Sequence, residues 1–373
     1  MRKKIKKILI IVGTVILLLS LSTYLYLQRA AFGSLSSGER LEEITKSPNY
    51  KDGEFQDLSV TPTLAEGYTF WGELGKQFFE KTEGIRPSMR IPSVQTDLKN
   101  IPLDSNVLVW FGHSSCYLQL NGKRILIDPV FSDSASPIPG TVQPFPGADT
   151  YKAEDMPEID YLLISHDHYD HLDYPTMIAM KEKIKTVICG LGVGAHFERW
   201  GYPAHKVIEK DWNDSITIQQ NFVIHTLPTR HKSGRGLSQN RSLWLSYLIN
   251  TPKMKVYYSG DGGYDKHFAA IGKQFGPIDI AIMENGQYDK AWHYIHLLPE
   301  ETLQAARDLK AKRIVPVHNS KFALAKHPWN EPLNEITRLN EHYKIPLITP
   351  VIGEVVNLED TNKVFRRWWT DKK

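Results

Sequence analysis

The sequence predicts an α+β chain in which two β-sheets pack face to face, helices cover their outer faces, and one transmembrane helix precedes them. Three observations support this fold class. An uncharged run of twenty residues follows a basic N-terminus, short strand-like segments recur from residue 106 onward, and helical segments are interspersed among them. Two amphipathic layers of strands need covering helices, which gives a helix–sheet–sheet–helix sandwich.

The first thirty residues have the features of a membrane anchor. Ile8 to Leu27 contains no charged residue, and twenty residues at about 1.5 Å each span the roughly 30 Å of a bilayer core. Basic residues precede this run, and Tyr24 and Tyr26 occupy the place of interfacial aromatics. We therefore expect residues 1–30 to form a cytoplasmic basic tip and a single-pass anchor in the cell membrane, with the remaining chain extracytoplasmic. A cleaved signal peptide is the alternative.

The anchor also accounts for the basic pI of about 8.5. Residues 1–30 hold six of the 45 Lys and Arg residues and no acid, which leaves 39 basic and 42 acidic residues in the remainder. A mildly acidic remainder argues against nucleic acid as a partner. Cys116 and Cys189 both lie in apolar segments, so we expect two buried thiols, with one disulfide as the alternative.

Residues 31–105 are expected to form an extension that packs on the main domain, residues 106–373. Its segment YTFWGELGKQFFE contains the aromatic residues Phe70, Trp71, Phe78 and Phe79. We expect these side chains to pack on the main domain. The alternative is that they line a groove for an acyl chain near the membrane.

From residue 106 the pattern predicts the two sheets. Segments 115–120 and 123–128 flank Asn121-Gly122, a dipeptide typical of a type I′ hairpin. The predicted strands are 106–111, 115–120, 123–128, 159–165, 186–189, 222–227, 242–249, 255–260, 278–284 and 312–317. The predicted helices are about 173–184, 263–273, 298–310 and 332–342.

The segment SHDHYDH, residues 165–171, directly follows the apolar strand IDYLLIS. Within it, His166, His168, Asp170 and His171 are four potential metal ligands. Four ligands so close together are hard to wrap around one tetrahedral ion, whereas two adjacent ions divide them naturally. We therefore expect a binuclear metal site at the end of this strand.

Three further candidate ligands follow later strands: His231 in PTRHKSGRG, Asp261 in YYSGDGGYD and His318 in IVPVHNSKF. Glycines flank Asp261 and allow close backbone approach, and a short carboxylate there suits a bridge between two ions. Each of the three is a weak signal alone, since single loop histidines and Asp-Gly turns are common. Together with residues 165–171 they supply the ligands that two ions need.

The order of these motifs resembles the metallo-β-lactamase fold superfamily, and within it the chain is similar to the N-acylphosphatidylethanolamine-hydrolysing phospholipase D family. The resemblance rests on GHSSCYLQLNGKRILIDPVFSDSASP, LLISHDHYDHLDYPT, RHKSGRG, SGDGGYD, HLLPEE and PVHNSKFALAKHPWNEP. It extends from about Phe32 to about residue 357. It implies the four-layer αββα sandwich of that superfamily, with residues 106–373 as the catalytic domain.

The resemblance also implies two bound Zn²⁺ ions, although His and Asp sites accept other divalent metals as well. The implied ligands are His166, His168 and His231 for one ion, and Asp170, His171 and His318 for the other, with Asp261 as the bridge.

Further roles follow from the same resemblance. Asp128 in LIDPVF is expected to orient a ligand histidine, and His113 in a GH motif is expected to do likewise. His296 in HLLPEE is expected near the substrate head group, with helix capping or a surface position as the alternative. Asp170, Asp261 and His296 are the residues expected to act in catalysis.

The chain also departs from the animal members of that family, which carry a Trp after the last ligand His where this chain has Asn319. Lys232 and Lys321 are further differences near the expected mouth of the site. With Arg235 they are candidates to hold an anionic substrate, and ordinary solvation of these charges is the alternative.

These features predict a membrane-anchored, binuclear zinc hydrolase of phosphodiesters, of phospholipase D type, with N-acyl phosphatidylethanolamine-like phospholipids as favoured substrates. Metal-bound hydroxide would attack phosphorus, and water or His296 would protonate the leaving alkoxide. The alternative is a zinc-dependent lactonase or esterase that acts on a small phosphorylated metabolite. A non-catalytic metal-binding protein is disfavoured because no ligand is missing. The sequence leaves the oligomeric state open, whether monomer or homodimer.

Overall fold

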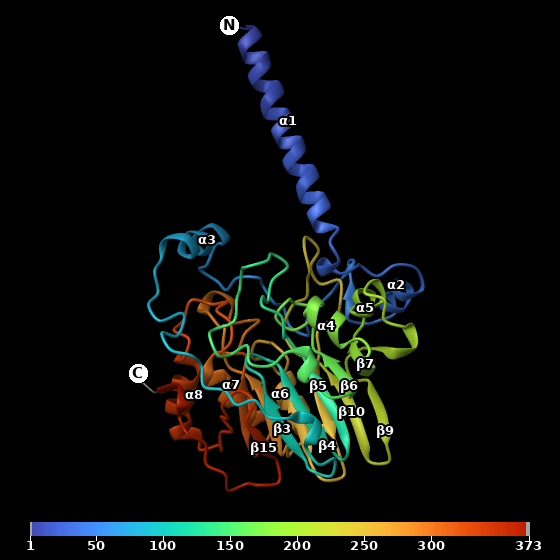
Figure 1. Cartoon of the computed structure of the whole chain (residues 1–373), viewed down its shortest axis with the longest axis vertical. Coiled ribbons are helices and arrows are strands. Elements are labelled where there is room, and N and C mark those ends of the chain that lie inside the picture. The colour runs from blue at the N-terminus through green and yellow to red at the C-terminus, as the bar shows by residue number, and fades with distance from the viewer. Residues whose placement is uncertain (1, 371–373) are drawn as a thin grey trace.

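The computed structural model describes residues 2–370, apart from the side chains of residues 77 and 78. Two sheets pack face to face and a long N-terminal helix extends away from them (Figure 1). The first sheet has the strand order β15 (Val355–Asn357), β3 (Val107–Trp110), β4 (Cys116–Leu120), β5 (Lys123–Ile127), β6 (Ile159–Ile164), β7 (Ile184–Gly190), β8 (Val207–Lys210). The second has the order β14 (Ile314–Val317), β13 (Ile280–Glu284), β12 (Lys255–Tyr258), β11 (Ser246–Asn250), β10 (Phe222–Leu227), β9 (Ser215–Gln219).

Alternation along the strands divides the apolar side chains between an inner and two outer layers. In β4, Leu118 belongs to the core between the sheets, whereas Tyr117 belongs to the core under the helices of the first sheet. In β12, Tyr258 faces the inner core and Tyr257 faces the helices of the second sheet. Because both faces are covered, these strands are apolar at nearly every position.

Helices cover both outer faces, as the four-layer prediction requires. Two short helices, α4 (Tyr174–Met180) and α5 (Gly194–Arg199), pack on the first sheet. Three more pack on the second sheet: α6 (His267–Phe275), α7 (Pro299–Asp308) and α8 (Glu331–Tyr343). The prediction of the fold class is therefore confirmed.

Strands that carry candidate site residues end at a shared edge of the two sheets. β5, β6 and β7 run parallel in the first sheet, and β12, β13 and β14 run parallel in the second. Backbone bonds join the sheets at this edge: His113 N donates to Asn319 O (2.9 Å) and Leu245 N donates to Ser165 O (2.8 Å). The loops that follow strands of both sheets therefore lie close together at this shared edge.

Several predicted strands are shorter in the structure, the one over 242–249 most of all, and several elements were not predicted. The strand predicted over 242–249 begins only at Ser246, because Leu243 N and Leu245 N bond across to Leu191 O and Ser165 O instead of to a neighbouring strand. The polar strands β8 and β9, the short β15 and the six-residue α5 have too weak a pattern to be recognised. Cys116 and Cys189 are free, buried thiols.

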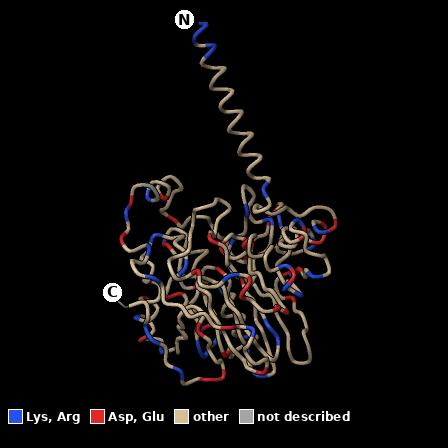
Figure 2. The backbone as a smooth tube through the Cα atoms, viewed as in Figure 1, with Lys and Arg blue, Asp and Glu red and all other residues tan. Residues whose placement is uncertain are grey.

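The N-terminal region contains α1 (Arg2–Leu27), α2 (Gly38–Thr45), a strand pair β1 (Tyr50–Lys51) and β2 (Glu54–Phe55), and α3 (Phe70–Phe79). None of the α1 residues, all of which are described, is buried. Figure 2 shows basic residues at the N-terminal tip of this helix and none along its middle. By length and composition α1 is able to cross a bilayer, a property that signal sequences share.

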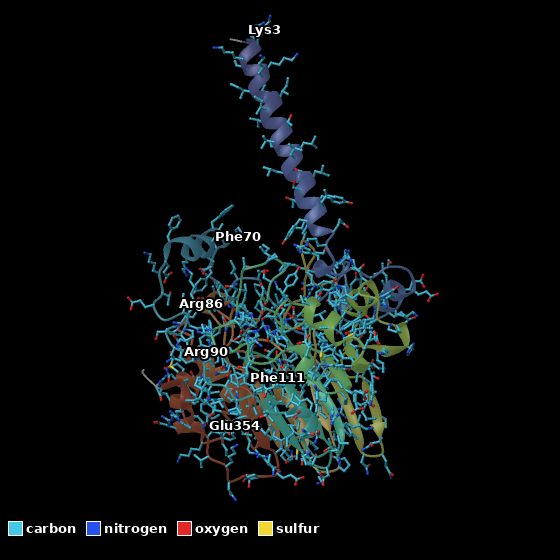
Figure 3. All side chains as sticks on the ribbon, viewed as in Figure 1. Lys3, Phe70, Arg86, Arg90, Phe111 and Glu354 are labelled. Atoms are coloured by element: carbon cyan, nitrogen blue, oxygen red, sulfur yellow. The ribbon has the colours of Figure 1, made fainter. Side chains whose placement is uncertain are left out.

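The expectation that the aromatic side chains of α3 pack on the main domain is wrong. Phe70, Trp71 and Phe79 are 64%, 76% and 88% exposed, and the side chain of Phe78 lies outside the described part. Other residues of the extension are buried: Phe55 and Ile91 belong to the core between the sheets. The extension is thus packed on the sandwich, while α3 stands out from it (Figures 1 and 3).

Candidate metal centre

Residues 165–171 form a buried loop directly after β6. His171 N and Leu172 N both donate to His168 O (3.1 and 2.8 Å), which closes the loop into a tight turn. His166 and His171 are buried, and Asp170 is 9% exposed. The turn thereby presents several polar side chains to the edge where the two sheets meet.

The first group of candidate ligands is His166, His168 and His231. His166 Nε2 lies 2.9 Å from His168 Nδ1, which lies 3.3 Å from His231 Nε2. The Nδ1 atom of His231 donates to Ile295 O (2.8 Å), so its Nε2 carries a lone pair toward the other rings. Three imidazole nitrogens that converge in this way suit a shared metal ion.

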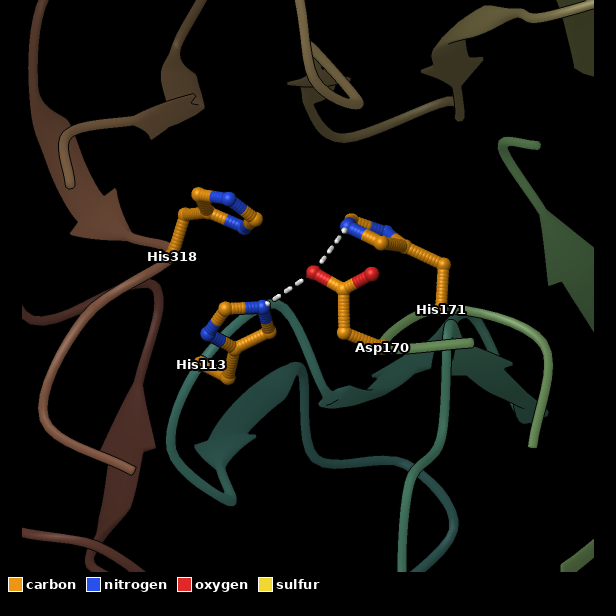
Figure 4. A group of neighbouring side chains, drawn as sticks. All are labelled: His113, Asp170, His171 and His318. Carbon is orange, nitrogen blue, oxygen red and sulfur yellow. Dashed lines mark hydrogen bonds and ion pairs between the residues drawn. The ribbon is translucent and has the colours of Figure 1, made fainter. Parts of the chain in front are cut away.

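The second group is His113, Asp170, His171 and His318 (Figure 4). Asp170 Oδ2 lies 2.8 Å from His113 Nε2 and 3.5 Å from His171 Nε2. His318 is positioned by Ser114, whose Oγ lies 2.8 Å from its Nδ1, and by a backbone bond from His318 N to His113 O (2.9 Å). His113 thus touches Asp170 directly and holds its carboxylate in place.

Asp261 lies between the two groups. Its Oδ2 is 3.1 Å from His171 Nε2 and 4.0 Å from His231 Nε2, and its Oδ1 is 3.2 Å from His318 Nδ1. Gly260, with φ of +59°, lets the chain turn here close to Leu245 O, where a Cβ atom would lie 2.7 Å away. The carboxylate is therefore within reach of residues from both groups.

Charge and burial determine the protonation of these side chains. Burial, with neighbouring histidines, lowers the pKa of His166, His231 and His318 well below the usual value, so these rings are neutral at pH 7. Burial opposes ionisation of Asp170, but His171 and His113 outweigh it and hold the pKa of Asp170 well below its usual value. Burial raises the pKa of Asp261 to about 7, and the nearby Glu284 carboxylate adds to this rise.

These residues fit a bound divalent cation. Asp261 Oδ1 and His318 Nε2 are buried and have no hydrogen-bond partner among the described residues, which is costly unless another group satisfies them. Neutral imidazoles and carboxylates are the donors that Zn²⁺ and similar ions prefer. A cation would also favour the ionised forms of Asp261 and Glu284, whose pKa values burial raises.

Glu284 is a site residue that the sequence analysis missed. It ends β13 and is fully buried, its Oε2 accepts from Gly262 N (2.7 Å), and its Oε1 bonds to His296 Nδ1. Glu284, Asp261, His296 and His318 form another cluster able to hold a metal ion. The available signal was an acidic residue at the end of an otherwise apolar strand, IAIME.

A cavity of about 330 Å³ opens above these groups. Most of its wall comes from the loops at the shared edge, and Thr63 and Leu64 come from the N-terminal extension. Its lining residues are Thr63, Leu64, His168, Asp170, Asp261, Gln287, Trp292, Ile295, His296, His318 and Leu324. His296 therefore borders the cavity, as expected of a residue near a substrate.

Asp128 lies behind the candidate ligands. Its Oδ2 is 2.8 Å from His171 Nδ1, which directs the Nε2 atom of His171 toward Asp261. The position of Asp128 suits the orienting role expected of it, whereas the His113 ring bonds to the Asp170 carboxylate and not to a ligand histidine. Both orienting roles stay predictions.

Two of the charged residues that are candidates to hold an anionic substrate lie elsewhere. Arg235 is buried and donates to Asp167 O and Leu172 O (both 2.7 Å). Lys321 is buried and donates to Val130 O (2.7 Å), so neither side chain is able to bind an anion in the cavity. Asn319 is likewise buried, not at the mouth, and its Nδ2 donates to Val317 O (3.0 Å).

Asp167 and Lys232 form hydrogen bonds with residues outside the two groups of candidate ligands. Asp167 turns away from the site to His196 Nε2 (3.1 Å) and Ser242 Oγ (2.8 Å). Lys232 donates to Thr63 Oγ1 (2.6 Å), next to the cavity wall.

Comparison with known proteins agrees with this geometry. Residues 123–319 match the family described as "Beta-lactamase superfamily domain". An uncharacterised protein of Mycobacterium tuberculosis is 34% identical over 332 residues, which cover 87% of this chain and 88% of that protein. The N-acyl-phosphatidylethanolamine-hydrolyzing phospholipase D 1 of Caenorhabditis elegans is 26% identical over 364 residues, which cover 85% and 98%.

A solved structure shares the fold. The metallo hydrolase Igni18 of Ignicoccus hospitalis superimposes with a TM-score of 0.53 at 18% identity, and the match covers 68% of this chain and 97% of that one. The matched family, the full-length relatives and the two-sheet architecture agree with one another. The chain therefore belongs to the metallo-β-lactamase superfamily and is a metal-dependent hydrolase.

Proposed function

We propose that this protein is a membrane-anchored, binuclear zinc phosphodiesterase of phospholipase D type that acts on N-acyl phosphatidylethanolamine-like phospholipids. The observation that carries the proposal is the position of Asp261 between two groups of candidate ligands at the base of one cavity. Residues 1–30 are the anchor, residues 31–105 the extension and residues 106–373 the catalytic domain in this proposal.

His166, His168 and His231 would hold one ion, and Asp170, His171 and His318 the other, with Asp261 shared between them. Two bound ions supply a nucleophilic water at neutral pH and neutralise charge on the phosphate oxygens. The residues around the ions determine how the ligand side chains are oriented. Asp128 holds the ring of His171 and His113 holds the carboxylate of Asp170, so neither ligand has to be ordered when the metal binds.

His296 would donate a proton to the leaving alkoxide. Glu284 bonds to its Nδ1 atom, so Nε2 is the nitrogen available to the cavity that His296 lines. To act as the general acid the ring must be doubly protonated, with Nδ1–H bonded to Glu284 and the Nε2 proton passed to the alkoxide. The Glu284 carboxylate orients this charged ring and stabilises it. In this assignment the Glu284–His296 pair would supply the proton, while the seven residues named above would hold the two ions.

An apolar pocket next to the cavity supports a lipid substrate. This pocket, of about 430 Å³, is lined by Thr63, Leu64, Phe70, Glu73 and Leu74. Thr63 and Leu64 also line the cavity over the candidate metal site. A phosphodiester bound in the cavity would therefore place an acyl chain against these apolar side chains.

The substrate proposal is tested with the full chain in vesicles that contain N-acyl phosphatidylethanolamine. We expect release of phosphatidic acid, lost in His166→Ala and retained in His205→Ala, which changes an exposed histidine that precedes β8 and does not line the cavity. Lactone or ester turnover without phosphodiester cleavage would instead support the zinc-dependent lactonase. Metal analysis of the purified chain, with about two Zn²⁺ expected per chain, tests the binuclear assignment separately.

A further inference from the structure

We infer that α3 and two loops beside α1 form a second membrane-contact surface, which holds the cavity side of the domain against the bilayer that α1 crosses. The surface comprises α3 and the loops of residues 136–141 and 234–240. Its partner is the phospholipid head-group layer of that same bilayer. The inference rests on the membrane anchoring in the proposed function and goes beyond it, because an anchor alone does not set the orientation of a domain.

No flexible linker separates α1 from the domain. α1 ends at Leu27, and the residues that follow are bonded to the domain at once. Trp200 Nε1 donates to Ala30 O (2.8 Å), Arg235 donates to Ala31 O (2.7 Å), and the Arg199 guanidinium donates to Gln28 O. Because these bonds begin directly after α1, the domain has less freedom to change its distance and orientation relative to the bilayer than a domain on a flexible linker.

Both loops touch the end of α1 and expose an apolar side chain beside it. The hydroxyl of Tyr26 donates to Pro137 O (2.9 Å), and the next residue, Ile138, is 52% exposed. Gly236 lies against Leu27, because a Cβ atom there would be 3.8 Å from its Cδ2, and the next residue, Leu237, is 86% exposed. Two apolar side chains thus sit where α1 would leave the membrane.

α3 supplies the third part of the surface. It lies at the same end of the domain as the base of α1 (Figure 1), and Phe70 at its start (labelled in Figure 3) is 64% exposed. Its apolar residues Phe70, Trp71, Leu74, Phe78 and Phe79 recur at helical spacing, as in helices that lie in a membrane interface. None of its described side chains is buried.

Local contacts stabilise α3 without covering its aromatic residues. Thr69 Oγ1 accepts from Gly72 N (3.1 Å) and caps the start of the helix, and Lys326 Nζ donates to Glu80 O (3.0 Å) at its end. Trp71 is 76% exposed, and tryptophan is enriched at membrane interfaces because its ring is apolar and its N–H remains hydrated. Contact with lipid would bury this aromatic surface, which no described residue covers.

Site-specific labels in the full chain test the inference. The native Cys116 and Cys189 are 0% exposed, so an environment-sensitive fluorophore attaches only to an introduced cysteine. The labelled variants are Trp71→Cys and Leu237→Cys in the surface, Thr14→Cys in α1, and Leu103→Cys as the control. Leu103 is 52% exposed and lies beside Gly122 in the β4–β5 turn, at the opposite ends of the strands from the site.

Each variant is reconstituted in phosphatidylethanolamine and phosphatidylglycerol vesicles that contain nitroxide-labelled lipids. We expect nitroxide lipids to quench the labels at 71 and 237 about threefold more strongly than the label at 103. Quenching at 14 without quenching at 71 and 237 would overturn the inference, since the domain would stand clear of the lipid. Absence of quenching at all four positions would overturn it together with the anchor. The quenching measurement does not depend on enzymatic turnover. A failure of the phosphodiesterase proposal would appear only in the activity assay, so the two proposals are tested separately.

Discussion

His171 Nδ1 lies 2.8 Å from Asp128 Oδ2, and both side chains are fully buried. Asp128 also accepts from Ser165 N (2.8 Å), Ser165 Oγ (2.5 Å) and the hydroxyl of Tyr258 (2.6 Å). Asp128 follows β5, Ser165 follows β6 and Tyr258 ends β12, so one carboxylate joins the two sheets directly behind the candidate metal centre. It fixes the imidazole with Nε2 toward Asp261, 3.1 Å away.

Asp128→Asn should weaken metal binding by about 10- to 100-fold, because the amide is a poorer acceptor for the His171 N–H. Competition with a chromogenic chelator measures the change. Asp160→Asn is the matched control, since Asp160 is in β6 but bonds to Arg124 N and Lys185 Nζ, away from the site. Equal metal affinity in the two variants would contradict an orienting role for Asp128.

Asp261→Asn should affect both candidate ions at once. The carboxylate reaches residues of both groups, and an amide offers only one oxygen to share between them. We expect metal content to fall below two ions per chain and phosphodiester turnover to fall by at least about 100-fold. Metal analysis and a turnover assay on the same sample check both parts. A variant that keeps two ions and full turnover would exclude Asp261 as the bridge.

Glu284→Gln should slow the cleavage of substrates with poor leaving groups. Glu284 bonds to His296 Nδ1, and its Oε1 lies 4.0 Å from His318 Nε2. Without the carboxylate, we expect kcat for an alkyl phosphodiester to fall by about 100-fold, with little change for a 4-nitrophenyl ester, whose leaving group needs no proton. His296→Gln should give the same selective loss. An equal loss on both substrates would indicate damage to the metal centre instead.

Lys321 should make folding stability depend on pH. Burial lowers the pKa of Lys321 from its ordinary 10.5 to about 7, although its Nζ donates to Val130 O (2.7 Å) and Phe111 O (3.2 Å). Between these two pH values the unfolded chain binds the extra proton, so the free energy of unfolding rises as pH rises from about 7 to about 10. Below about pH 7 both states carry the proton and this contribution is constant.

The comparison of the natural chain with Lys321→Met isolates this effect, because methionine does not titrate. We expect the difference in unfolding free energy, natural chain minus variant, to grow by up to about 1.4 kcal/mol per pH unit over that range. Urea unfolding at constant metal concentration measures it, and Lys312→Met, which changes a lysine whose side chain is 59% exposed, is the matched control. A difference that does not vary with pH would show that Lys321 keeps its ordinary pKa.

The two-sheet fold was predictable because its signals are local. Strand alternation, the Asn121-Gly122 hairpin and the helical segments are read within short windows, and the strands they predict form the two sheets. The candidate ligands were recognisable for a similar reason: His166, His231 and the others are metal-binding residue types placed directly after apolar strands. Their assignment to individual ions stays a prediction.

Other features depend on packing between distant segments, and no short window contains that information. Glu284 belongs to the site because β13 lies between β12, which leads to Asp261, and β14, which leads to His318. The sequence makes Lys321 and Arg235 candidates to bind an anion, yet both are buried, and they bond to the distant residues Val130 and Ala31. Phe70 and Trp71 were expected to be covered, and the fold leaves them exposed.

The sequence by itself thus determined the fold class, the residue types of the candidate metal centre and the apolar N-terminal helix, since each follows from residue type and short-range spacing. Only the tertiary structure decided which charged side chains face the cavity, which carboxylates hold the histidines, and which apolar side chains remain without a partner. The physical reason is that burial and hydrogen bonding are properties of the surroundings of a side chain, and distant parts of the chain supply those surroundings.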